Sequence, residues 1–70
     1  MIDATAIGKR LVDLRGEKSR QTVAKDLKIS VSALQMYENG KRIPRDEVKV
    51  RIAEYYNTSI EAIFFAAYLH

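Results

Sequence analysis

Residues 29–44, ISVSALQMYENGKRIP, combine short hydrogen-bonding side chains with a cluster of cations. Ser30 can cap a short helix, whose first turn would carry Val31, Ser32 and Ala33. The pair Asn39-Gly40 then interrupts the helical pattern, and a basic turn follows with Lys41, Arg42 and Arg45. A helix with a small-residue face beside a cationic turn predicts a surface that recognises an anionic partner.

The composition excludes several kinds of chemistry. The chain has no cysteine, so it can form neither a disulfide nor a thiolate metal site, and its single histidine, His70, is the last residue. We also find no constellation of nucleophile, general acid and general base. The sequence therefore predicts a protein that is not an enzyme, with no metal, no cofactor and no evident small-molecule ligand.

Charge and aromatic residues are distributed unevenly along the 70 residues. Residues 1–45 hold ten Lys and Arg against five Asp and Glu, whereas residues 46–70 hold two against four. Aromatic residues are concentrated in the last sixteen residues, and only Tyr37 lies earlier. The first part is predicted to meet a polyanion and the second to supply packing.

The length allows one domain, spanning residues 1–70, and a monomer of this size is expected to be only marginally stable. The N-terminal MIDATAIGKR lacks the apolar run of a signal peptide. The longest apolar run, 63–69, is far shorter than the roughly 20 residues of a membrane-spanning helix. We expect a soluble, cytoplasmic chain without membrane contact.

Helical periodicity dominates the first half of the chain, and no segment alternates like a strand. Ile7, Leu11 and Leu14 would share the core face of a first helix that ends near Arg15-Gly16. Ser19 is a good N-cap for a second helix, and residues 28–29 form a very short link to the helix after Ser30. Helices joined in this way must cross sharply.

The second half predicts two more helices. One runs from about Pro44 to Tyr56, with proline in its first turn and acidic residues at its N-terminus. Asn57 can adopt a left-handed conformation, and Thr58 with Glu61 fits a capping box before the apolar segment 60–69. Asn39-Gly40 is interpreted as a helix C-cap and not as a hairpin turn, since its flanks do not alternate.

These segments together resemble the DNA-binding domain of phage repressors and Cro, the xenobiotic-response-element family of helix-turn-helix regulators. The resemblance covers nearly the whole chain and is carried by IGKRLVDLR (7–15), VAKDLKIS (23–30), VSALQMYENGKRIP (31–44) and IAEYYNTSIEAIF (52–64). It implies an all-α fold of five helices, with the helix-turn-helix at about 19–39 and a C-terminal packing or dimerisation helix at about 59–69.

The resemblance also implies which residues bind DNA. In this family the helix over 31–37 enters the major groove. Base reading then falls on Val31, Ser32 and Met36, with Gln35 nearby, although Met36 could equally be a core residue. Such an apolar reading surface favours contacts with thymine methyl groups.

Phosphate contacts are predicted for Arg20, Asn39, Lys41 and Arg42. The family commonly has Gln in place of Arg20, and Gly in place of Lys28, which suggests a left-handed residue there. An acid at the position of Glu38 pairs in the family with the Arg that ends the first helix, here Arg15.

The sequence therefore predicts a regulator of transcription, repressor-like, that binds a near-palindromic site on double-stranded DNA as a homodimer. The predicted dimer contact consists of Phe65, Tyr68 and Leu69. The alternative is a protein-interaction module that uses the basic face and the C-terminal helix. RNA binding is less favoured, since no aromatic stacking positions lie beside the basic cluster.

Overall fold

The computed structural model describes residues 3–65, and these residues form helices without any strand. The elements are α1 (Ala4–Arg15), α2 (Arg20–Leu27), α3 (Val31–Glu38), α4 (Asp46–Tyr55) and the short π-helical segment η1 (Glu61–Phe65). The predicted all-α, five-helix fold is confirmed for this part of the chain.

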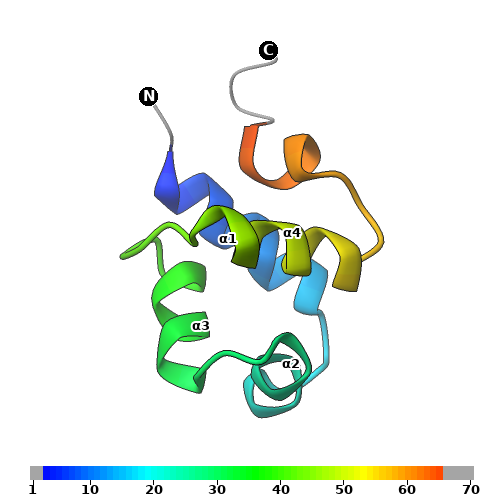
Figure 1. The fold of residues 1–70 in the computed structure, drawn as a ribbon. Helices are drawn as coiled ribbons and strands as arrows, with labels where there is room; N and C mark the ends of the chain where they lie inside the picture. Colours follow the sequence, from blue (N-terminus) through cyan, green and yellow to red (C-terminus); the bar gives the residue numbers. More distant parts are fainter. Residues whose placement is uncertain (1–2, 66–70) are drawn as a thin grey trace.

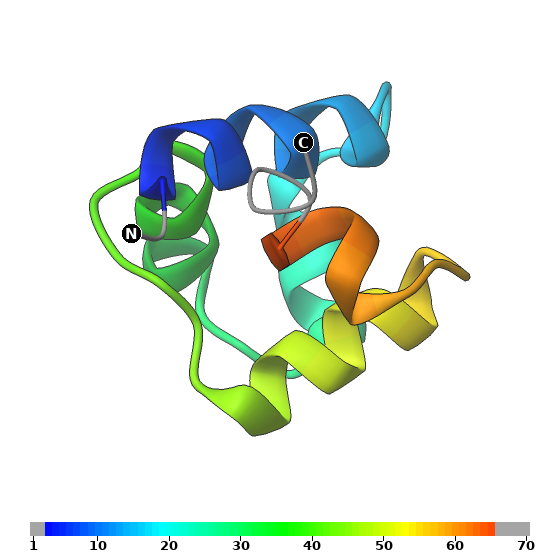
Figure 2. The same ribbon diagram turned by 90° about the horizontal axis from the view of Figure 1, so that it is seen from above.

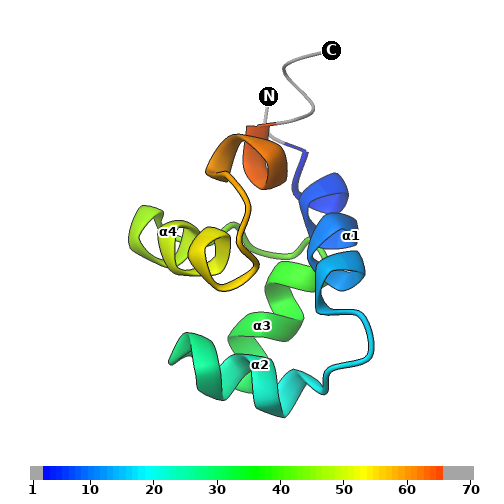
Figure 3. The ribbon, with the colours of Figure 1, turned by 90° about the vertical axis from the view of Figure 1, so that its right-hand side faces the viewer.

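The helices enclose one apolar core. α1 packs against α3 and η1, while α2 packs against both α3 and α4 (Figure 1). Figure 2 shows η1 between α1 and α4, and Figure 3 shows it at the end of the domain opposite α2. The largest fully buried side chains come from all five elements: Ile7, Leu11, Val23, Leu27, Leu34, Ile52, Ile63 and Phe64.

Side-chain caps begin the first three helices. The Oγ of Ser19 accepts a hydrogen bond from the Thr22 amide at 3.1 Å, and the Oγ of Ser30 accepts one from the Ala33 amide at 3.0 Å. Both caps are as predicted, and Asp3 caps α1 in the same way. Each cap satisfies a backbone N–H that has no partner within its helix.

Gly8 lets α1 lie directly on the end of α3. A Cβ atom at this buried position would lie only 2.9 Å from the carbonyl oxygen of Tyr37, and it would also collide with the carbonyl of Glu38. Because these are backbone atoms, they cannot move aside as a flexible side chain would. The absence of a side chain at Gly8 therefore sets the distance between the two helices.

Two predicted details of the helices are wrong. Leu14 does not join Ile7 and Leu11 in the core but is 38% exposed, because it lies at the edge of the hollow between α1 and Ile63. α4 begins at Asp46 and not at Pro44, because Arg45 has extended backbone with ψ 161° and acts as the N-cap. Asn57 adopts the predicted left-handed conformation, with φ 54°.

The fifth element also differs from its prediction. Its cap is Ser59, whose Oγ accepts from the Ala62 amide at 3.0 Å, so the predicted Thr58–Glu61 capping box is wrong. The segment 61–65 is π-helical, and it buries Ile63 and Phe64 side by side. The Nε of Arg10 on α1 holds it in place by donating to the Ile63 carbonyl at 2.6 Å.

Candidate nucleic-acid interface

A tight turn links α2 to α3. Lys28 is left-handed, with φ 60° and ψ 41°, as the family's glycine at this position suggests. The amide of Ile29 donates to the carbonyl of Ala24 at 3.0 Å, which closes the C-terminus of α2. Ser30 then starts α3 at once, so only three residues separate the two helices.

α3 presents one face to the core and another to the surface. Leu34 and Tyr37 are buried among the core residues. The predicted base-reading residues all lie on the exposed face: Val31, Ser32, Gln35 and Met36. Met36, whose placement the sequence left open, is 43% exposed. The structure thus brings the four predicted readers together on one surface.

The turn after α3 is a glycine C-cap. Gly40 is left-handed, with φ 72°, and the amide of Lys41 donates to the carbonyl of Met36 at 2.9 Å. This confirms the interpretation of Asn39-Gly40 as a helix end. Asn39, Lys41 and Arg42 are exposed on the turn, at the opposite end of α3 from Ser30.

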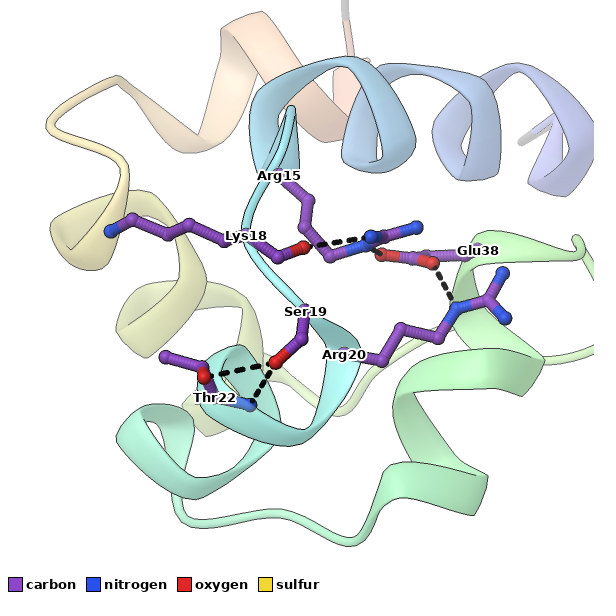
Figure 4. Close-up of polar contacts among 6 residues, drawn as sticks. All are labelled: Arg15, Lys18, Ser19, Arg20, Thr22 and Glu38. Carbon is purple, nitrogen blue, oxygen red and sulfur yellow. Dashed lines mark hydrogen bonds and ion pairs between the residues drawn. The ribbon is translucent and has the colours of Figure 1, made fainter.

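The carboxylate of Glu38 joins three helices (Figure 4). Its Oε2 lies 2.8 Å from the Nε of Arg15, the last residue of α1, and its Oε1 lies 2.8 Å from the Nε of Arg20, the first residue of α2. The Glu38 side chain is 0% exposed. The predicted pair of Arg15 and Glu38 is confirmed, and Arg20 is a second partner that the sequence did not predict.

The pKa values of Arg15 and Tyr56 are raised in and beside the ion pairs of Glu38. The hydrogen bond to Glu38 raises the pKa of Arg15, whose Nη1 also donates to the Lys18 carbonyl at 2.9 Å. Burial raises the pKa of Tyr56 to about 12, and the negative charge of Glu38 adds to the effect. The Tyr56 hydroxyl is buried and has no hydrogen-bond partner among residues 3–65. Tyr56 is therefore neutral at neutral pH.

Comparison with known families agrees with this geometry. A family model described as Helix-turn-helix matches residues 9–63. The chain belongs to the helix-turn-helix family. Its members of the Cro/CI type are DNA-binding regulators of transcription, and this helix-turn-helix protein is therefore a DNA-binding transcription regulator. A search of the curated proteins found no match.

Side chains of α4 form hydrogen bonds with α2, the first helix of the helix-turn-helix. The Nη1 of Arg51 donates to the carbonyl of Leu27 at 2.7 Å, near the end of α2. The Tyr55 hydroxyl donates to Asp26 at 2.7 Å and accepts from the Nζ of Lys18 at 3.3 Å. Sequence reasoning missed these contacts, because each joins residues on different elements and leaves no local pattern.

The predicted dimer contact is only partly within residues 3–65. Phe65 packs partly against the protein's own core, and the Nζ of Lys49 lies 5.6 Å from its ring centroid. It also borders a hollow of about 280 Å³ that includes Ile60 and the exposed Val50. Tyr68 and Leu69 lie outside the described residues.

Residues 3–65 contain neither a cluster of metal ligands nor a membrane-spanning helix. No three His, Cys, Asp or Glu side chains in this part gather as metal ligands would. None of its helices has both the length and the apolar character needed to cross a bilayer.

Proposed function

We propose that the helix-turn-helix protein is a repressor-like regulator that binds double-stranded DNA in a sequence-specific manner, with α3 in the major groove. The observation that carries this proposal is the surface of α3. Its exposed side chains are uncharged hydrogen-bonding or apolar groups, and the turn at its end exposes Lys41 and Arg42. Such a surface fits a base edge flanked by phosphates.

Phosphate binding is proposed for the residues that border α3. Asn39, Lys41 and Arg42 are exposed beyond its C-terminus. Arg20 lies at the N-terminus of α2, and its guanidinium gives only Nε to Glu38 among the hydrogen bonds of residues 3–65. Its terminal nitrogens are thus available to a phosphate oxygen while Nε keeps the side chain in place. Arginine here would combine a structural and a binding role.

We further propose a homodimer on a near-palindromic operator. The support is the apolar side chains of Phe65 and Val50, which line the hollow between η1 and α4. Burying this apolar surface against a second copy would stabilise a domain as small as this one. A two-fold axis would place two copies of α3 about 34–36 Å apart, one turn of DNA. The repressor role follows from the resemblance to phage repressors.

The test is selection of binding sites from random double-stranded DNA, followed by a salt titration on the selected site. We expect a shared sequence with two inverted halves, and an affinity that falls steeply with salt as counterions are released. A protein-interaction module would select no sequence. Recovery of random DNA at every salt concentration would overturn the proposed sequence specificity.

A further inference from the structure

The exposed face of α3 carries no charge. Glu38 is the only charged residue of this helix, and its fully buried carboxylate is bonded to two arginines. Val31 and Met36 are 37% and 43% exposed, so apolar atoms form a substantial part of the face. Ser32 and Gln35 supply its only exposed hydrogen-bonding side chains.

The missing charges limit which base edges this face can recognise. Bidentate recognition of guanine typically uses arginine or lysine, and a carboxylate accepts from the amino group of cytosine. Neither is present on the exposed face of α3. The apolar side chains require an apolar group on the DNA, and the major groove offers one at the base edges, the C5 methyl group of thymine.

The two apolar side chains can reach different base pairs. Val31 and Met36 are five residues apart, which is about 7.5 Å along the helix axis, against 3.4 Å between successive base pairs. Each also has a hydrogen-bonding neighbour one helical turn away: Gln35 follows Val31, and Ser32 precedes Met36. The face thus contains two separate pairs of one apolar and one polar side chain.

We propose that Val31 and Met36 recognise the C5 methyl group of a pyrimidine and not thymine as such, so that the regulator also accepts 5-methylcytosine. This inference rests on the proposed binding of α3 in the major groove. Thymine carries an acceptor oxygen at C4 and cytosine a donor amino group. Methylation of cytosine at C5 adds the methyl group that thymine already has at that position. Side chains of carbon and thioether sulfur sense mainly the methyl group.

The experiment uses the full chain and the operator obtained by selection. Each thymine is replaced in turn by deoxyuridine, which lacks only the methyl group, and each T·A pair by C·G with or without methylation at C5. At positions that face Val31 or Met36, we expect deoxyuridine to bind about fourfold more weakly than thymine, the effect of one buried methyl-sized group. We expect 5-methylcytosine to bind about fourfold more tightly than cytosine.

Variants of the chain assign the effect to its side chains. Val31→Ala and Met36→Ala should each abolish the methyl preference at one position and keep it at the other. The matched control is Val12→Ala, since Val12 is 39% exposed but lies on α1, and this variant should keep both preferences.

The outcomes separate this inference from the proposed function. An operator that is selected but binds equally well with and without C5 methyl groups at every position would overturn the inference alone. Methyl preferences that survive in both Val31→Ala and Met36→Ala would also overturn it. A chain that binds all DNA sequences alike would overturn the proposed function as well.

Discussion

The Nε of Arg15 lies 2.8 Å from the Oε2 of Glu38 and connects the last residue of α1 to the last residue of α3. A carboxylate removed from water requires such partners, because an isolated buried charge is strongly unfavourable. The position of α3, the helix proposed to enter the major groove, is thus tied to α1 through one ion pair. Arg20 extends the same connection to α2.

Removal of a partner from this cluster should destabilise the domain. We expect Arg15→Ala to lower the free energy of unfolding by about 3 kcal/mol, near the lower end for a broken buried pair, because Arg20 still neutralises Glu38. Urea denaturation measures the change, with the exposed Arg42→Ala as a control of less than about 0.5 kcal/mol. A double-mutant cycle of Arg15 and Glu38 without coupling energy would contradict the structural role.

The turn between α2 and α3 should tolerate glycine. Lys28 is left-handed, a conformation that costs a residue with a side chain roughly 1 kcal/mol, so Lys28→Gly should be neutral or stabilising by up to that amount. Lys25→Gly, within α2, should instead lose about 1 kcal/mol, since glycine is unfavourable inside a helix. Equal losses for the two variants in urea would argue against the left-handed turn.

Two adjacent tyrosines should respond oppositely to loss of their hydroxyl groups. Tyr55→Phe loses the hydrogen bonds to Asp26 and Lys18 and should cost about 0.5–1.5 kcal/mol. Tyr56→Phe removes a buried hydroxyl that has no partner in the described part of the chain, and it should be neutral or stabilising. Urea denaturation of both variants at pH 7 tests this, and a larger loss for Tyr56→Phe would contradict it.

Tyr56 also makes the free energy of unfolding depend on pH in the alkaline range. Since the pKa of Tyr56 is raised to about 12 in the folded protein, the unfolded chain releases this proton first, from near pH 10. The contribution of Tyr56 is therefore complete below pH 10 and is lost as the pH rises toward 12. Tyr56→Phe should show a shallower fall in unfolding free energy over this range than the wild type, and identical slopes would disprove the assignment.

Binding measurements should distinguish the proposed base-reading residues from the proposed phosphate-binding residues. Val31→Ala, Ser32→Ala or Met36→Ala should change base preference, by about 1–3 kcal/mol for a strong contact. Lys41→Ala or Arg42→Ala should weaken all sequences alike and reduce the salt slope by about one. Fluorescence anisotropy on selected and random DNA distinguishes the two, and uniform losses for every α3 variant would refute base reading.

The proposed dimer depends on the apolar side chain of Phe65. Phe65→Glu should give a folded monomer with weak binding to a two-half-site operator, because a carboxylate there is costly to cover. Sedimentation equilibrium measures the association, and circular dichroism confirms that the variant is folded. A wild type that is monomeric at high micromolar concentration and occupies a single half-site would end the dimer proposal.

Local signals account for what the sequence predicted well. The caps at Ser19 and Ser30 and the left-handed Asn57 depend on a few neighbouring residues, so their patterns are visible in the chain itself. The left-handed conformation of Lys28 was implied by the glycine that the family has at this position. The pairing of Arg15 with Glu38 came from family resemblance, because 23 residues separate the two partners. Helical periodicity placed Val31, Ser32 and Gln35 on the outward side of the helix, whereas the placement of Met36 was left open.

Contacts between helices account for what the sequence did not predict. The second partner of Glu38 depends on how closely α2 approaches α3, and nothing local to Arg20 reveals this distance. Leu14 has the correct spacing for the core, but it lies at the edge of the hollow between α1 and Ile63 and is therefore exposed. η1 is π-helical, a form that no local sequence pattern predicts, and it buries Ile63 and Phe64.

Gly8 has a consequence for how the sequence can vary. The position carries neither charge nor hydrogen-bonding side chain, yet any larger residue would press α1 against the backbone carbonyls at the end of α3. In a library of single substitutions, selected for operator binding, we expect position 8 to retain glycine while the exposed Lys9 beside it accepts most residues. Enrichment of several residue types at position 8 would show that the two helices can separate without loss of binding. If position 8 instead retains glycine, the close contact of α1 with the backbone of α3 restricts the sequence more at this buried position than at the exposed Lys9 beside it.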